Sequence, residues 1–166
     1  MKRTAILILT LAVASAATGC GYSMQPLHRT DVRTVAVSIF ASKEFRRELE
    51  FELTRQLVKY LELRTPYKVV HDPERADTSL RGEVLDLYAP VLTEDVDTDD
   101  PNDIEVSLTC WFEWKDLRTG EVLKRRDRIT GSATYAEAVG ETLDSATFEA
   151  SARLAERIVE AMEKDW

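Results

Sequence analysis

Cysteine and histidine, which are common as nucleophiles, bases and metal ligands, are scarce in this chain of 166 residues, with two of each. It contains no CxxC pair, no HExxH motif, no glycine-rich phosphate loop and no serine in a nucleophile elbow. Glu50 and Glu52 are two residues apart on a predicted helix, so they lie on different faces and cannot act as a paired acid and base. The sequence therefore predicts a protein that is not an enzyme and that uses no cofactor.

The remaining candidate ligands do not form a site. Asp95, Asp97 and Asp99 imitate the start of a calcium loop, which also needs Gly at its sixth position and Glu at its twelfth. Asp100 and Val106 occupy those two positions, so we interpret residues 94–103 as a solvated hairpin loop and predict no metal. Cys110 lies on the apolar face of a predicted strand, and His28 and His71 lie in no motif that could supply it with a base. We expect Cys110 to be a buried structural thiol.

Positive charge is also in short supply. There are 22 Lys and Arg against 30 Asp and Glu, which gives a formal net charge of −8. Binding to nucleic acid depends mainly on cationic contacts to phosphates, so an acidic domain of this kind is a poor candidate for it.

The chain has one long apolar run, Ala5 to Ala17, which follows Lys2 and Arg3. It is shorter than the ~20 residues that a spanning helix needs, so it is typical of a cleaved export signal. The stretch "AATGCGY" ends the run, and its cysteine after Gly19 resembles the lipobox of bacterial lipoproteins, with Ala17 in place of the usual leucine. That resemblance implies that Cys20 carries diacylglycerol and a palmitate-type acyl chain, which would anchor the protein. The alternative is a plain signal peptide in which the cysteine is incidental.

The lipobox divides the chain into three parts: a signal peptide at residues 1–19, a lipidated tether at 20–32 and a single domain at 33–166. Gly21 follows the cysteine, where an Asp would retain many enteric lipoproteins at the inner membrane. This resemblance implies an outer-membrane location, at the periplasmic face. With Cys20 acylated, Cys110 has no partner, so burial of apolar surface must hold the fold together.

Hydrophobic periodicity predicts the order β-α-β-β-β-β-α. Alternation predicts strands at 34–40, 67–70, 78–92, 104–114 and 121–135, with a shift of the inward set in 78–92 that indicates a β-bulge. Apolar residues recur with helical spacing in a first helix and again from Leu143 to Met162 in a last one. The first stripe consists of Phe45, Leu49, Leu53, Leu57 and Leu61. We predict an α+β fold, a two-layer α/β sandwich in which two helices cover one face of a mixed sheet.

The one basic cluster, "KRRDR", lies in the last predicted strand. Strict alternation would place Lys124, Arg126 and Arg128 on one side of the sheet, the side away from the helices. Guanidinium groups suit phosphate and carboxylate groups, so the three residues are a candidate contact for an anionic ligand such as lipopolysaccharide. The alternative is that their long side chains cover the sheet and pair with Glu105 or Glu113.

The chain as a whole resembles the lipopolysaccharide-assembly lipoprotein family, LptE. The resemblance lies in "CGY", in "VRTVAVSIFASKEFRRELEFELTRQLVKYLE" with a Glu50-x-x-x-Thr54 step, and in "ADTSLRGEVL", "DLRTGEVL" and "ASARLAERIVEAMEKDW". It implies an outer-membrane lipoprotein that plugs the lumen of the β-barrel LptD and assists barrel assembly and lipopolysaccharide transport to the cell surface. Of the functional residues, the resemblance carries over only Cys20.

A second hypothesis is a periplasmic lipoprotein that regulates a cell-wall synthase or another envelope enzyme. Such regulators usually sit behind a long disordered linker, whereas the tether predicted here is short, which favours the barrel subunit.

Overall fold

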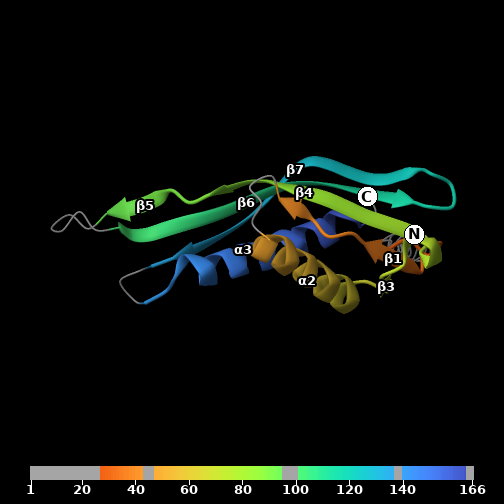
Figure 1. Ribbon diagram of the computed structural model, residues 1–166, viewed down its shortest axis with the longest axis horizontal. Coiled ribbons are helices and arrows are strands. Elements are labelled where there is room, and N and C mark those ends of the chain that lie inside the picture. Colours follow the sequence, from red (N-terminus) through yellow and green to blue (C-terminus); the bar gives the residue numbers. More distant parts are fainter. Residues whose placement is uncertain (1–26, 43–46, 95–100, 137–139, 164–166) are drawn as a thin grey trace, which may run out of the picture.

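The computed structural model describes residues 27–42, 47–94, 101–136 and 140–163 (Figure 1). In chain order its elements are β1 Thr34–Val37, β2 Ala41–Ser42, α2 Arg47–Arg64, β3 Lys68–Val70, the 3-10 turn η1 Pro73–Arg75, β4 Thr78–Tyr88, β5 Val91–Glu94, β6 Pro101–Asp116, β7 Val122–Tyr135 and α3 Leu143–Ala161.

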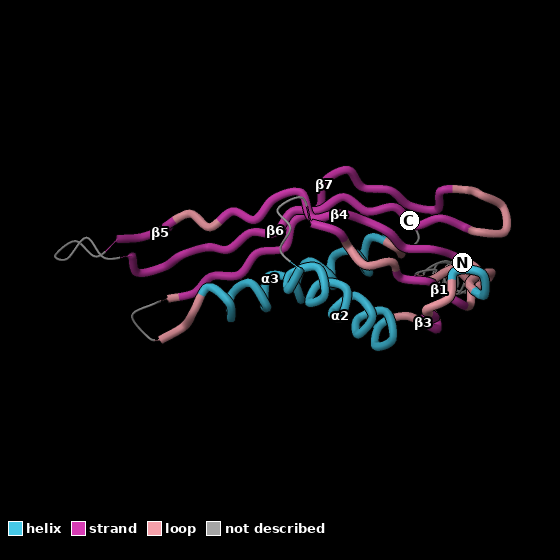
Figure 2. The backbone as a smooth tube through the Cα atoms, in the orientation of Figure 1, coloured by secondary structure: helices cyan, strands magenta, loops and turns pink. Residues whose placement is uncertain are grey.

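The two layers are clear in Figures 1 and 2, where α2 and α3 lie together on one side of the sheet. The seven strands form one mixed sheet in the order β3-β1-β4-β6, with β7 on the outer edge of β6. The short strand β2 pairs with β4, and β5 pairs with β6 beyond the end of β4. The predicted α+β fold, with two helices on one face of a mixed sheet, is confirmed.

The first half of the chain is a strand–helix–strand crossover, in the β-α-β order that the hydrophobic periodicity predicts. β1 pairs in parallel with β3 on one edge and with β4 on the other, and α2 connects β1 to β3. Glu50 and Thr54 of α2 hold the chain between β1 and α2 in place by side-chain hydrogen bonds. The Glu50 carboxylate accepts the Ser42 backbone N–H at 2.7 Å, and the Thr54 hydroxyl oxygen accepts that of Phe40 at 3.1 Å. These two bonds satisfy the backbone donors of Phe40, in the link after β1, and of Ser42, in β2.

The strand predicted at 78–92 is two strands, β4 and β5, and this is a correction. The break falls at Ala89 and Pro90, because proline has no N–H to donate to a ladder. The predicted bulge is confirmed, since the pairing of β4 with β6 shifts between Val84 and Asp86.

The core lies between the helices and one face of β6. The predicted inward residues of this strand are buried, as are the leucines of the α2 stripe from Leu49 to Leu61. Two apolar residues of the predicted strand 34–40 and of the predicted last helix do not lie in the core. Ile39 is 56% exposed because β1 ends at Val37, and Leu143 is 39% exposed because it begins α3, ahead of the buried positions of that helix. The inward face of β6 consists of Ile104, Val106, Leu108, Cys110, Phe112 and Trp114.

Among the described residues, no helix has both the length and the apolar content needed to cross a bilayer.

Candidate functional site

The sheet face opposite the helices is polar, and its central feature is an ion-paired row across three strands. In the ladder, Arg81 of β4 lies opposite Glu113 of β6, which in turn lies opposite Arg125 of β7. Arg81 donates to Glu113 Oε1 through Nε at 3.0 Å and Nη2 at 2.7 Å, and Arg125 Nη1 lies 3.6 Å from Glu113 Oε2. The two arginines cover Glu113 so that it is only 5% exposed, although it points away from the core.

Further polar pairs continue this face along β6. Trp111 Nε1 donates to the Glu83 carboxylate on β4 at 3.0 Å, and the hydroxyl groups of Thr109 and Thr130 lie 2.9 Å apart. No helix covers these groups, as Figure 1 shows. The arrangement therefore presents a polar, ordered surface without a reactive centre, which suits recognition by a polar partner.

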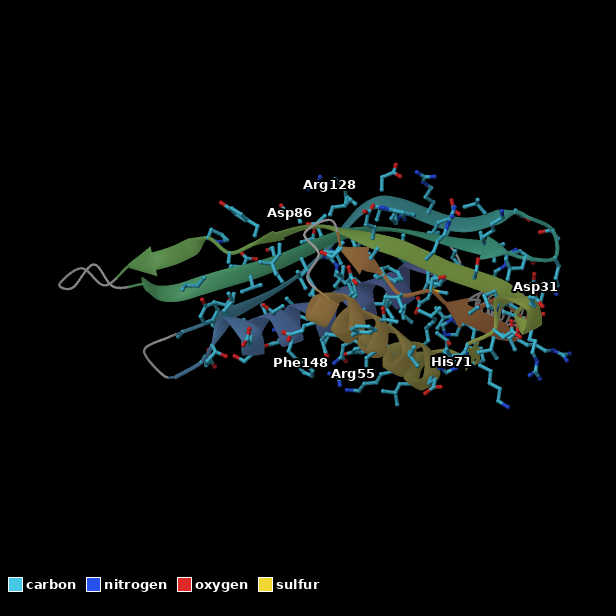
Figure 3. All side chains as sticks on the ribbon, in the orientation of Figure 1. Asp31, Arg55, His71, Asp86, Arg128 and Phe148 are labelled. Carbon is cyan, nitrogen blue, oxygen red and sulfur yellow. The ribbon has the colours of Figure 1, made fainter. Side chains whose placement is uncertain are left out.

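The predicted basic residues do not share one face, and this corrects the expectation from strict alternation. Two directly opposed residues of an antiparallel pair have their side chains on the same face. Arg126 lies opposite Phe112 and Lys124 lies opposite Trp114, so both side chains are on the helix side of the sheet. Arg128 points away from both helices, at the top of Figure 3.

The physical reason is a β-bulge in β7. From Cys110 to Phe112 the partner strand advances three residues, from Ile129 to Arg126, so β7 carries one extra residue there. The extra residue reverses the alternation. Arg125, which sequence reasoning missed, thereby takes the outward position opposite Glu113. The alternative of pairing with Glu113 is thus realised by Arg125 and not by the three predicted residues.

Arg126 and Arg128 are both exposed, and within the described part of the chain neither forms an ion pair. Arg125 is different, because it also contacts Asp127 at 3.0 Å. The basic segment Lys124–Arg128 therefore offers two uncompensated guanidinium groups, one on each face of an edge strand.

The start of the domain and the β6–β7 turn meet at Asp77. Its carboxylate accepts the backbone N–H groups of Arg33 at 2.9 Å and Thr34 at 3.0 Å, and its carbonyl accepts that of Leu117 at 2.9 Å. The hydrogen bond from the Arg33 backbone lowers the pKa of the Asp77 carboxyl. In the turn itself, hydrogen bonds from the Arg118 side chain lower the pKa of Asp116 to about 2. The β6–β7 turn and the N-terminal segment consequently lie at the same end of the molecule.

The cysteines, histidines and acidic residues considered as reactive groups or metal ligands form no site in the described structure. Burial raises the pKa of the Cys110 thiol to about 12, so at neutral pH it is protonated and unreactive. Cys20 and Asp95–Asp99 lie outside the described residues. Among the residues that the structure describes, no group of three or more His, Cys, Asp or Glu could hold a metal ion. His28 packs edge-on against Tyr67, with ring centroids 5.8 Å apart, and His71 is exposed beyond β3.

Together these features define a two-layer α+β domain with an open polar sheet face and a basic edge segment. The family model of LptE, described as lipopolysaccharide-assembly, matches residues 32–162. The chain belongs to this family, which confirms the resemblance read from the sequence and assigns the chain to lipopolysaccharide assembly. No curated protein matches the sequence.

Solved structures with the same fold are distant in sequence. Rare lipoprotein B from Shewanella oneidensis is 18% identical, with a TM-score of 0.50, over 78% of this chain and 93% of that one. Lipoprotein B from Nitrosomonas europaea is 10% identical, with a TM-score of 0.55, over 86% and 89%. A PelC dodecamer subunit from Paraburkholderia phytofirmans is 17% identical, with a TM-score of 0.52, over 86% and 96%. At these identities the likeness shows the fold alone.

Proposed function

We propose that this chain is a lipid-anchored subunit of the outer membrane, at its periplasmic face, that binds and plugs an LptD-like β-barrel. In this role it assists assembly of the barrel and transport of lipopolysaccharide to the cell surface. The observation that carries the proposal is the family match, which spans residues 32–162 and so includes almost the whole domain.

The anchor in this proposal is Cys20, acylated after removal of residues 1–19. Two or three acyl chains hold a soluble domain to a bilayer stably, at ~0.8 kcal/mol per buried CH₂. Seven positions separate Cys20 from Leu27, the first described residue, so an extended chain between them reaches at most about 25 Å. The anchored end of the domain then stays close to the membrane surface, where the barrel is.

The open sheet face supports a barrel as partner. The interior wall of an outer-membrane barrel is polar, in contrast to its lipid-facing exterior. The row Arg81–Glu113–Arg125 and the Glu83–Trp111 pair give this domain a face of matching polarity with ordered donors and acceptors. Contacts of this kind contribute specificity more than affinity, because they exchange hydrogen bonds with water for hydrogen bonds with the partner.

Co-purification tests the proposed partner. The tagged full-length chain, extracted in mild detergent and analysed by mass spectrometry, should bring down one large outer-membrane barrel, and depletion of the chain should reduce the amount of assembled barrel. A tagged lipoprotein of similar size and unrelated sequence is the control. Recovery of a cell-wall synthase or another envelope enzyme without a barrel would favour the regulator hypothesis and contradict this proposal.

The basic segment of β7 is our candidate for contact with lipopolysaccharide, through Lys124, Arg126 and Arg128. Phosphates are bound most strongly by guanidinium groups that can donate two parallel hydrogen bonds. Arg126 and Arg128 have no acid to neutralise them in the described structure, and they lie on opposite faces of an edge strand. A phosphate group beside the strand is therefore accessible to both.

Replacing Lys124, Arg126 and Arg128 together with Ala should weaken binding of purified lipopolysaccharide by at least about tenfold, ~1.4 kcal/mol. The matched control replaces three exposed basic residues elsewhere, Arg55, Lys59 and Arg75, and so makes the same change in net charge. That control should change affinity less than about twofold, since distant charges are screened by salt. Equal losses in the two variants would show that only net charge matters and would remove the site from β7.

A further inference from the structure

A hollow of about 440 Å³ lies where the N-terminal segment meets the domain, beyond the end of α2. Its volume is within the range of ligand pockets, which are typically ~300–1,000 Å³. Asp31, labelled at the far end of the molecule in Figure 3, marks this region. The lining includes three apolar residues, Leu27, Val32 and Pro66, and three basic or imidazole side chains, His28, Arg29 and Arg33.

The polar part of the lining is only partly paired. Arg29 Nε is buried without a hydrogen bond, and its nearest acid, Asp31, lies 3.5 Å away with 56% of its side chain exposed. His28 Nδ1 is likewise buried and unbonded. Arg33 forms no ion pair with any residue in the described ranges. The side chain of Arg29 is 32% exposed and Arg33 is exposed, so both residues offer guanidinium donors at the hollow. A cationic lining of this kind favours an anionic ligand that accepts hydrogen bonds.

The neighbouring acids leave the guanidinium groups available. The Asp77 carboxylate is engaged by the backbone N–H groups of Arg33 and Thr34, so it is not a partner for the Arg33 side chain. Asp31 is held to Arg29 only by the 3.5 Å approach, which is longer than a charge-assisted hydrogen bond. The 3.5 Å approach therefore leaves Arg29 able to donate a shorter, charge-assisted hydrogen bond to another anionic group.

The segment that carries these groups is held in place. The Arg29 backbone N–H donates to the Tyr67 hydroxyl oxygen at 2.9 Å, and the Tyr67 ring packs against Trp114, with centroids 5.7 Å apart. Val32 is 4% exposed, within the core. Because the backbone is fixed at both points, the segment that bears Arg29 and Arg33 is already ordered before any ligand binds, which lowers the ordering cost of binding.

We propose that this hollow binds the headgroup of an anionic glycerophospholipid. Its phosphate would lie between Arg29 and Arg33, and its glycerol backbone and first methylenes would lie against Leu27 and Pro66. The apolar wall favours an amphiphile over free phosphate, and 46% of Leu27 is exposed and available to it. The inference rests on the proposed anchoring at Cys20, which keeps this end of the domain at the bilayer surface. Bound lipid would fix the angle at which the domain leaves the membrane.

The test uses the full chain purified from membranes in mild detergent, with phosphatidylglycerol as the probe and native mass spectrometry as the readout. One phosphatidylglycerol per protein should bind. Diacylglycerol with the same acyl chains, which lacks the phosphate, should not bind. Inorganic phosphate should bind at least about tenfold more weakly than phosphatidylglycerol. Equal affinity for free phosphate, or for diacylglycerol, would overturn the assignment to a phospholipid headgroup.

The variants Arg29→Gln and Arg33→Gln should each weaken phosphatidylglycerol binding by at least about tenfold, because each removes a charged donor from the hollow. Lys68→Gln, an exposed basic residue on neighbouring β3 that does not line the hollow, is the matched control and should leave binding unchanged. Thermal midpoints should not move, since Arg29 and Arg33 hold the segment through backbone groups that Gln retains. Unchanged phosphatidylglycerol binding in both arginine variants would contradict the proposal. This measurement needs no barrel, so its failure is distinct from a failure of the co-purification.

Discussion

Gly131→Ala should be strongly destabilised, by about 3 kcal/mol, which lowers the thermal midpoint by ~10 °C. A Cβ at this position on β7 would lie 2.4 Å from Leu154 N and 2.7 Å from Ala150 O, both of which are backbone atoms of α3. A flexible side chain could move aside, but a helix backbone packed against the sheet cannot move without displacing other core residues. Far-UV circular dichroism of the full chain in mild detergent during heating is the measurement.

Thr134→Ala is the control for this variant, because Thr134 is an exposed neighbour on the same strand. It should stay within about 0.5 kcal/mol of the natural protein, as surface substitutions usually do. If Gly131→Ala melts as high as Thr134→Ala does, then α3 is not in close contact with β7 at this point, and the packing of the two layers is wrong.

Phe40→Ala is the second variant with a large expected effect, a loss of roughly 3–5 kcal/mol in the free energy of unfolding. Phe40 is fully buried, and its ring occupies the space above Gly82 in β4, where an added Cβ would lie 2.3 Å from Phe40 Cε1. Removal of the ring leaves a cavity beside β4, in the link between β1 and β2, which both pair with that strand. Chemical unfolding with urea, with the slope compared between variants, gives the free-energy change.

Phe51→Ala makes the same substitution on α2 at a position that is 59% exposed, and it should cost less than about 1 kcal/mol. A further test adds Gly82→Ala. Two of the three close atoms around that position belong to Phe40, and the third is Trp111 O, so Gly82→Ala should cost less in the Phe40→Ala background than in the natural protein. Additive losses would mean that the ring does not lie over Gly82.

Positions on regular elements with one buried face were predictable from the sequence. Leu49, Leu53 and Leu57 repeat with the helical period, and Val106, Leu108 and Phe112 alternate, so a single core fixes which side each faces. The bulge in β4 was also visible, because its apolar set changes parity between Val84 and Leu87.

The bulge in β7 was not predictable, because no apolar alternation marks the segment Lys124–Arg128. A strand segment that is polar on both faces carries no signal of its register, so one extra residue opposite Trp111 goes unseen. That single residue decides that Arg125 and not Arg126 reaches Glu113. The hollow beside Arg29 was missed for a related reason, since it depends on how an aperiodic segment packs against Tyr67.

The position of β1 determines how the domain withstands tension. A protein tied to a bilayer by its N-terminus and gripped by a barrel is pulled at the start of β1. This strand is bonded on both edges to parallel neighbours, β3 and β4, and its first residues are also tied to Asp77. A force along the strand loads these bonds together, in shear, and does not unzip them one after another. If the domain is anchored through Cys20 as proposed, the pulling force acts on its mechanically strong end, where β1 is bonded on both edges.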